Sequence, residues 1–423
     1  MTTTATARPR VLDRPTSLRV TLADRTIWLT LGVVAAVVYA IWTGPQPQQI
    51  DAFGPLAHAF LNGRLYIELP APGALELIAR DGGGWYVPYP PGPAIPLLPV
   101  IAITNFLGAT LDIGLAAAGL GGVGVALLYV ALRSLNVAAR TAAILTVGFA
   151  FGSVWWWAAG EGDVWLYAHV NAVVFMLGAL ILALRGGWPL VSGLLFGVAL
   201  ASRLPVGLTF PLFLALHSGA RWTSLTDLQG SLRAIRWRPI LAFSAGVIAV
   251  GIGLALYNFA RFGSFFDFGY TRIPGIPEDQ FFGVGVLSLD YIPRHFYAMF
   301  LRSFDYVDQF PWFRPNWMGL SLLITTPIFL WLVRARSRTT LVAIGWIAVA
   351  LALLPIVTHG TVGQAQFGYR FSLDFAPILW LMLGLVFTNG MSVAARVAVA
   401  LGVAVNLYGI WAIDALHFVA WPP

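Results

Sequence analysis

The residues of this chain that could do chemistry are carboxylates and arginines placed at the ends of apolar runs. Asp51 stands where the first apolar run ends, Asp163 and Glu161 lie in a short polar break, and Arg203 separates two apolar stretches. Cysteine is absent, which excludes disulfides, thiolate zinc sites, iron–sulfur clusters and a cysteine nucleophile. Any catalysis must therefore use carboxylate, imidazole, guanidinium, phenol or hydroxyl groups, and these suit proton transfer and anion binding.

The composition places these residues in a membrane protein. Of the 423 residues, 58% are hydrophobic and 10% are charged, with a mean hydropathy of +0.78. Soluble globular domains do not reach such values, so the chain is predicted to cross a bilayer many times. The formal charge of +7 comes with basic residues that are all arginine and mostly flank apolar runs. They indicate membrane orientation rather than nucleic-acid binding.

We expect an all-α fold in one integral membrane domain over residues 1–423. A crossing needs about 20 apolar residues, and eleven segments meet this requirement or approach it. The predicted spans are 26–43, 112–132, 141–158, 168–184, 187–203, 204–218, 239–260, 317–333, 339–357, 374–391 and 395–414. The division of the pair between 187 and 218 is placed at Arg203-Leu204-Pro205, since proline ends a helix.

The arginines fix the predicted orientation. With 93–108 lying at the outer surface, 16 arginines fall inside and 9 outside; if that segment crossed, the split would be 12 to 13. The first arrangement obeys the positive-inside rule. It makes residues 1–25 a cytoplasmic tail at the plasma membrane and places two long segments, 44–111 and 261–316, outside. Fifteen of the 18 acidic residues then face outward.

Two interfacial helices are expected in the first outer segment. From Phe53 to Leu61, apolar residues recur at the spacing of an amphipathic helix with one apolar face. Such a helix suits the membrane surface. Residues 85–93 then combine aromatic rings with rigid prolines and should lead into a second helix of this kind.

Together these features resemble the GT-C superfamily of membrane glycosyltransferases. The shared features are an acidic residue after the first span, interfacial helices and ten or more further spans. The segments that carry the resemblance are Asp51, Asn62-Gly63-Arg64-Leu65-Tyr66, Tyr89-Pro90-Pro91-Gly92-Pro93, Gly160 to Trp165, Gly193 to Pro205 and Gln366 to Phe371. The likeness covers most of the chain as a layout, although each motif is short. Many members have two adjacent acidic residues after the first span, whereas here Ala52 follows Asp51.

The resemblance implies transfer of a sugar, with inversion, from a polyprenyl phosphate to a hydroxyl of an extracytoplasmic protein, lipid or glycan. In that chemistry a carboxylate takes the acceptor proton and cations stabilise the departing phosphate. Asp51 is then the general base, and Arg203 contacts the donor phosphate. Asp163, with Glu161, positions the acceptor or contacts a divalent metal. Because the second acidic residue is missing, metal dependence stays open.

Each candidate also has a structural interpretation. Asp51 could simply end a helix in water, and Asp163 and Glu161 could form a solvated turn. An arginine such as Arg203 is costly within a membrane unless it faces a polar cavity or reaches the interface. Arg370, beside Tyr369, and Arg261 are further candidates for substrate binding, and both could instead be interfacial anchors.

The histidines carry a weaker signal. His58 is predicted on the polar side of the first interfacial helix and is kept as a substrate-binding candidate. His169 begins a predicted span. For both, a polar pocket is the simpler explanation. No histidine or acidic spacing has the form of a zinc site, and a soluble nucleotide-sugar domain is not visible, which disfavours a nucleotide-sugar donor.

The second outer segment is too polar to span a membrane and too aromatic for a plain linker. We expect it to cap the site, with Asp267, Tyr270, Arg272 and Arg294 as its notable residues. The alternative function is a transporter or flippase of lipid-linked sugars, in which the same charges bind a headgroup without chemistry. A transporter favours internal symmetry, which the sequence does not show. A scaffold without catalysis is a more distant alternative.

Overall fold

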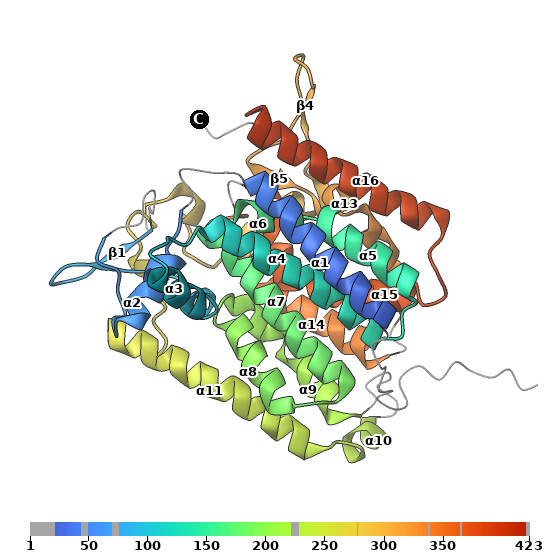
Figure 1. The fold of residues 1–423 in the computed structure, drawn as a ribbon, viewed down its shortest axis with the longest axis horizontal. Helices are drawn as coiled ribbons and strands as arrows, with labels where there is room; N and C mark the ends of the chain where they lie inside the picture. The colour runs from blue at the N-terminus through green and yellow to red at the C-terminus, as the bar shows by residue number, and fades with distance from the viewer. Residues whose placement is uncertain are drawn as a thin grey trace, which may run out of the picture.

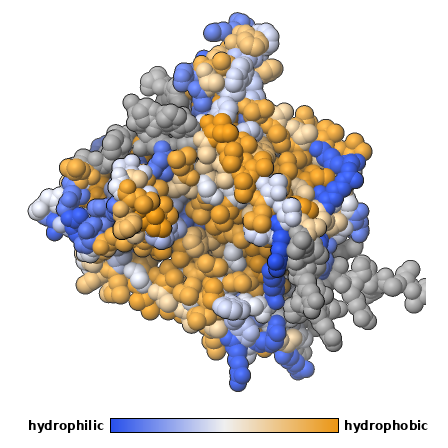
Figure 2. All heavy atoms as spheres, viewed as in Figure 1, coloured by the Kyte–Doolittle hydropathy of each residue, from blue (hydrophilic) through white to orange (hydrophobic). Residues whose placement is uncertain are grey.

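The computed structural model describes residues 22–43, 50–69, 76–220, 228–276, 278–336, 339–363 and 366–419. Most of the predicted cytoplasmic tail lies outside these ranges. Long helices lie side by side in the body of the molecule, and the short strands stand toward its edges (Figure 1). Apolar residues dominate the face in view, while hydrophilic residues gather toward its margins (Figure 2). The chain is a multi-pass membrane protein.

Among the described residues, six helices are long and apolar enough to cross a membrane, or seven if one bent pair forms a single span. The bent pair is α5 (Ala139–Phe151) and α6 (Trp155–Glu161), which meet at 53°. The six helices are α1 (Leu22–Thr43), α4 (Ile113–Ser134), α7 (Val164–Arg185), α11 (Trp237–Phe262), α14 (Thr340–Val357) and α16 (Val393–Ile410).

The remaining predicted spans coincide with shorter elements. These are α8 (Pro189–Leu200), the 3-10 helix η2 (Leu204–Thr209), α9 (Phe210–Ser218) and α15 (Ala376–Val386). The break predicted around Arg203 is confirmed, because α8 ends before it and η2 begins after it. The total of eleven crossings stays a prediction.

The predicted helix at 317–333 is wrong as a continuous element. Its residues form strand β5 (Met318–Leu320), one turn of helix α13 (Leu322–Thr325) and the 3-10 helix η8 (Pro327–Arg334). Pro327 has no backbone N–H and disfavours helical dihedrals at Thr326, whose φ of −139° and ψ of 67° lie outside the helical region. The proline therefore divides an apolar stretch that hydropathy alone would join.

Helices α1 and α4 pack tightly through small residues. A Cβ atom on Gly122 would lie 2.4 Å from the carbonyl oxygen of Gly32, so the two backbones approach closely only because both residues are glycine. At the other end of this pair, Arg133 Nε donates to Asp24 Oδ1 at 2.8 Å. Both residues had been placed on the inner side, so this contact agrees with the predicted antiparallel arrangement of α1 and α4.

The first outer segment forms helix α2 with the predicted bounds, Phe53–Leu61. Its apolar face is buried, with Phe53 against the rings of Tyr89 and Tyr167. The short hairpin of β1 (Ile78–Ala79) and β2 (Trp85–Tyr86) follows. The chain then passes through the 3-10 turn η1 (Gly92–Ala94) into α3 (Leu97–Phe106), where the second helix was expected. The interfacial position of both helices stays a prediction.

The second outer segment is built from short elements. Just after this segment, β5 pairs in parallel with β6 (Gln366–Gly368), which lies in the chain before α15. The other elements outside the long helices are α10 (Leu228–Arg233), η4 (Tyr270–Arg272), η5 (Gln280–Phe282), η6 (Leu289–Tyr291), α12 (Ile292–Phe296), the π-helix η7 (Tyr297–Leu301), β3 (Asp305–Tyr306), β4 (Phe313–Arg314), η9 (Arg370–Asp374) and the π-helix η10 (Trp411–Ala415).

Candidate active site

Asp51 sits at the start of α2 and is partly buried. Its Oδ1 accepts a hydrogen bond from the backbone N–H of Gly54 at 2.8 Å, which satisfies a backbone donor in the first turn of α2. A Cβ atom on Gly54 would lie 2.3 Å from Asp51 Oδ2, so the carboxylate needs glycine at this place. Burial raises the pKa of Asp51 to about 6, although the N–H groups of Gly54 and Phe53 favour the charged form. A carboxylate tuned in this way is a suitable general base near neutral pH.

Asp163 caps the neighbouring helix α7 and lies beside the Asp51 segment. Its Oδ1 accepts from Leu166 N at 2.9 Å. The next residue, Val164, donates its backbone N–H to Ile50 O at 2.8 Å, and this bond joins the start of α7 to the segment before α2. Burial raises the pKa of Asp163, and the positive charge of Arg370 opposes this shift. Two carboxylates thus stand at two adjacent helix starts, as the sequence had suggested for each separately.

Arg370 supplies a buried positive charge to the same place. It is 8% exposed, and its guanidinium lies 5.9 Å from the ring centroid of Trp165 and 5.7 Å from that of Phe371. Its Nε is buried without a hydrogen-bond partner in the part of the chain that the structure describes. Asp163 is its strongest electrostatic partner. A buried donor of this kind is costly unless something accepts from it, so Arg370 is suited to an anion.

Arg203 is held by a carboxylate that the sequence reasoning missed. Its Nε donates to Asp374 Oδ1 at 3.0 Å, and a terminal nitrogen donates to Oδ2 at 2.9 Å. His169 Nδ1 lies 3.0 Å from the same Oδ1, and both His169 and Asp374 are buried. Arg203 therefore does not simply reach for the interface. It forms part of an Arg–Asp–His cluster assembled from three separate elements, and its side chain keeps 23% exposure.

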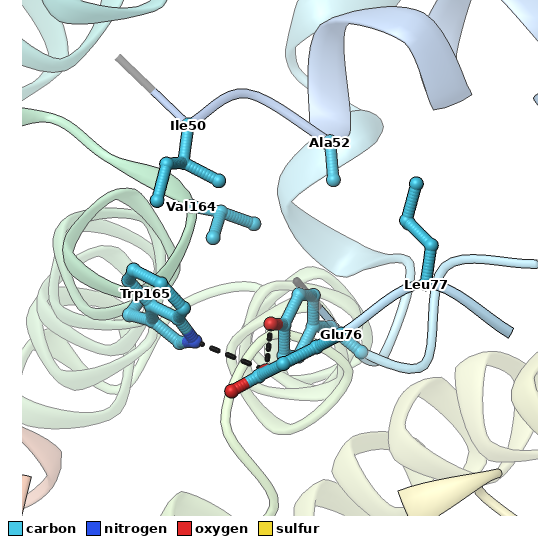
Figure 3. A pocket seen from close by; sticks show the side chains of 7 residues that line it. Ile50, Ala52, Glu76, Leu77, Val164 and Trp165 are labelled. Atoms are coloured by element: carbon cyan, nitrogen blue, oxygen red, sulfur yellow. Dashed lines mark hydrogen bonds between the residues drawn. The ribbon is translucent and has the colours of Figure 1, made fainter. Parts of the chain in front are cut away.

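Beside Asp51 and Asp163 lies a small cavity with a third carboxylate. Glu76 accepts from the Tyr89 hydroxyl and from Trp165 Nε1, the latter at 3.3 Å (Figure 3). The cavity has a volume of about 10 Å³, roughly enough for one water molecule. Its walls are Ile50, Ala52, Glu76, Leu77, Tyr89, Val164 and Trp165. Ile50 and Ala52 flank Asp51, and Val164 and Trp165 follow Asp163 at the start of α7, so the cavity lies next to both carboxylate residues.

The second outer segment reaches the same region through Tyr270. The Tyr270 hydroxyl lies 3.0 Å from His359 Nε2, and its electrostatic neighbours include Glu76, Arg203 and Arg370. Burial lowers the pKa of His359 to about 4, so the imidazole is neutral at neutral pH. Tyr270 thus lies within electrostatic range of the charged residues of the site, and the cap over the site stays a prediction.

The other residues expected in the cap have local partners. Asp267 pairs with Arg272 at 2.8 Å, and Arg294 donates to backbone carbonyls of Phe281 and Gly360. These contacts hold the shape of the second outer segment. Among the four residues expected in the cap, Tyr270 is the one described above as an electrostatic neighbour of Glu76, Arg203 and Arg370.

Several predicted substrate-binding residues have other partners. Arg261 donates to Val87 O at 2.6 Å and lies over the Tyr257 ring at 3.8 Å, so it fastens the first outer segment to α11. His58 is exposed on α2, on the polar side as expected, and its nearest side-chain partner is Asn62.

Tyr369 and Glu161 also have partners other than Asp51 and Arg370. The Tyr369 hydroxyl donates to His295 Nδ1 at 2.7 Å, because His295 Nε2 must donate to the carbonyl of His359. Glu161 interacts with Asp414 near the end of the described chain. Asp163 is also an electrostatic neighbour of Glu161, so the expected association of these two carboxylates stays a prediction. Tyr369 makes a structural hydrogen bond.

No group of three or more histidine, aspartate or glutamate side chains in the described ranges is arranged to hold a metal ion. The carboxylates of Asp51, Asp163 and Glu76 are of the ligand type that Mg²⁺ or Ca²⁺ prefers. The expectation of a divalent metal stays open on these observations.

The fold is that of a helical membrane protein, and carboxylates and arginines gather where α2, α7 and η9 begin. No family model matches the chain, and no curated protein matches it in sequence. A solved structure with a similar fold is ArnT from Cupriavidus metallidurans bound to undecaprenyl phosphate, with a TM-score of 0.52 and 16% identity over 92% of this chain. The chain spans 64% of the length of that protein. The resemblance predicted from the sequence is confirmed at the level of the fold.

Archaeal oligosaccharyltransferase from Archaeoglobus fulgidus also matches in two solved structures. One is the apo form, and the other is AglB in complex with an inhibitory peptide and a dolichol-phosphate. Each match covers 95% of this chain and 57% of that protein, with TM-scores of 0.43 and 0.45 and identities of 14% and 13%.

Proposed function

We propose that this protein is a glycosyltransferase that moves a sugar from a polyprenyl phosphate to the hydroxyl of an extracytoplasmic acceptor with inversion. The observation that carries the proposal is the position of Asp163, which lies next to the segment of Asp51 and is the strongest electrostatic partner of Arg370. Asp51 is a carboxylate with a raised pKa, and Arg370 has a buried Nε without a hydrogen-bond partner among the described residues. The fold supports it, since ArnT, which is similar in fold, was solved with undecaprenyl phosphate bound.

In the proposed reaction, the Asp51 carboxylate accepts the proton of the acceptor hydroxyl. The acceptor oxygen attacks the anomeric carbon from the face opposite the phosphate and forms the new glycosidic bond. The bond between that carbon and the phosphate oxygen breaks, and the lipid phosphate leaves with the electron pair. Arg370 stabilises the negative charge that develops on the phosphate, because a buried guanidinium needs no rearrangement to receive it.

The two arginines have different roles in this proposal. Asp374 already neutralises Arg203 through two hydrogen bonds, so Arg203 has less charge to offer than the sequence suggested. Arg370 is therefore the principal phosphate contact. Arg203 is a second phosphate contact, because 23% of its side chain is exposed. Asp374 and His169 fix its orientation.

Asp163 and Glu76 act on the groups that touch the substrates. Asp163 orients Arg370 electrostatically, and its helix start is joined to the Asp51 segment by a backbone hydrogen bond. Glu76 orders Tyr89 and Trp165, whose rings supply flat apolar surface of the kind that packs against sugars. The test therefore uses a panel of sugars and acceptors.

The test compares Arg370→Gln with Arg272→Gln in reconstituted vesicles. Arg272 is an outer arginine in an exposed ion pair with Asp267, which makes it a matched control for loss of one positive charge. We expect label transfer from a panel of polyprenyl-phosphate sugars to fall at least 100-fold with Arg370→Gln and to stay near wild type with Arg272→Gln. Equal activity of the two variants would refute the phosphate assignment. Transbilayer movement of the donor without any transfer by the wild type would instead support a flippase.

A further inference from the structure

A hairpin in the second outer segment projects from the helical body. Strands β3 and β4 pair Asp305 with Arg314 and Tyr306 with Phe313, and residues 307–312 form the turn. In Figure 1 the hairpin, labelled β4, projects above the red helix α16 and away from the packed helices. We call residues 305–314 the aromatic hairpin.

The aromatic hairpin exposes large rings to its surroundings. Tyr306 is 71% exposed, Phe310 65%, Phe313 53% and Trp312 45%. Some of these rings contact one another, as Phe310 and Trp312 do at 4.9 Å, but the helical core does not cover them. A group of large apolar side chains on a projecting turn usually marks a contact surface.

The other outer hairpin is a useful contrast. The turn between β1 and β2 consists of Arg80, Asp81 and the three glycines Gly82, Gly83 and Gly84. It carries no aromatic ring, and residues 81–83 are exposed. Hairpin geometry alone therefore does not demand the rings of residues 305–314.

The aromatic hairpin is attached to the outer end of a candidate span. Tyr408, in the last turn of α16, donates a hydrogen bond to Phe313 O, and its ring lies 5.6 Å from Phe304 and 6.1 Å from Trp411. Tyrosine and tryptophan at the end of a span are typical of the headgroup level of a bilayer. The base of the hairpin thus lies at the depth where α16 leaves the membrane.

Between its start and Tyr408, α16 exposes apolar side chains on its surface. Val397 is 50% exposed, Leu401 54% and Leu407 48%. In a membrane span such side chains face lipid. The exposed rings of the aromatic hairpin continue this lipid-facing surface at its outer end.

We propose that the aromatic hairpin is a membrane-interface anchor whose rings insert among the phospholipid headgroups of the outer leaflet beside α16. The occupant of this surface is the lipid interface, because the rings are continuous with a lipid-facing helix and are amphipathic or apolar as that region requires. The anchor holds the second outer segment, and with it Tyr270, at a fixed height above the bilayer. This inference does not depend on the reaction proposed above.

The test uses the absence of cysteine in the chain. Gln309→Cys places one thiol in the turn without removing a ring, and Asp81→Cys places one in the polar β1–β2 turn as the matched control. Both positions are exposed, so labelling should leave the fold intact. Each variant is labelled with an environment-sensitive fluorophore and reconstituted in vesicles of equal parts phosphatidylcholine and phosphatidylglycerol. Quenching is measured with a lipid that carries a nitroxide near its headgroup and, separately, with aqueous iodide.

We expect the label at position 309 to be quenched by the nitroxide lipid and protected from iodide, with the reverse at position 81. Gln309→Cys combined with Phe310→Ser and Trp312→Ser should lose at least half of the lipid quenching, since the rings drive insertion. Iodide quenching at 309 as strong as at 81 would overturn the proposal and indicate a surface for a protein or glycan partner. Lipid quenching that the two serine substitutions leave unchanged would also overturn it.

Discussion

Replacement of Gly54 by alanine tests how closely the site depends on the position of one carboxylate. The new Cβ atom would lie 2.3 Å from Asp51 Oδ2, whereas ordinary van der Waals contacts begin at 3.4 Å. The carboxylate must therefore retreat by about 1 Å, and a misplacement of that size in a catalytic group can cost about 100-fold in rate. Because Arg370 is untouched, donor binding should change little.

The assay measures initial rates of sugar transfer in vesicles over a range of donor concentrations. We expect Gly54→Ala to lower kcat by about 100-fold and to change KM for the donor by less than about threefold. Gly119→Ala is the matched control, because a Cβ atom on that helical glycine would meet no atom within 4 Å. If Gly54→Ala keeps its kcat within about threefold of wild type while remaining folded, the assignment of Asp51 as the base loses its geometric support.

Three further predictions concern acidity, a buried ion pair and a fastening contact. With the pKa of Asp51 at about 6, the base form is lost as the pH falls, so kcat/KM should rise about tenfold from pH 5 to pH 7; a flat profile would contradict this. Asp374→Asn leaves the Arg203 charge uncompensated and should lower the free energy of unfolding by about 3 kcal/mol, visible as a lower Tm, while an unchanged Tm would show that the pair is dispensable. Arg261→Ala releases the carbonyl of Val87 and should lower kcat without affecting the pH profile; a shifted profile would instead show contact with the reacting groups.

Much of the helical framework can be predicted from the sequence because its signals are local. Apolar runs long enough to cross a bilayer identify the six long helices, and the spacing of apolar residues from Phe53 to Leu61 predicts α2 with its correct ends. The segment 317–333 shows the limit of such reasoning. Its average composition is apolar, but Pro327 and the β5–β6 pairing decide its conformation, and the pairing partner lies about 50 residues away in the sequence.

The site was only partly predictable, since its residues come from distant parts of the chain. Asp51, Asp163 and Arg370 stood out because each is a charge at the edge of an apolar run. Glu76 and Tyr89 had no such signal and join the site only through folding of the first outer segment. Asp374 did carry one, as an acidic residue at the start of a predicted span, and that signal should have suggested a buried partner for Arg203.

The residue types also could not reveal which arginine is already neutralised. Arg203 and Arg370 look alike in sequence, each beside an apolar run. In the structure, Arg203 is bound by Asp374, while Arg370 retains a buried Nε without a partner among the described residues. Distances between elements determine this difference, and they are not encoded in local pattern or composition.

The most direct measurement is transfer of radiolabelled sugar from a panel of polyprenyl-phosphate donors by the purified protein in vesicles, with wild type compared with Asp51→Asn. Asparagine keeps the size of the side chain and an oxygen for the Gly54 N–H, but it cannot accept the acceptor proton. We predict label on an acceptor or as free sugar with wild type and its loss with Asp51→Asn, while donor binding is retained. Transfer by Asp51→Asn at the wild-type rate would contradict the assignment of Asp51 as the general base.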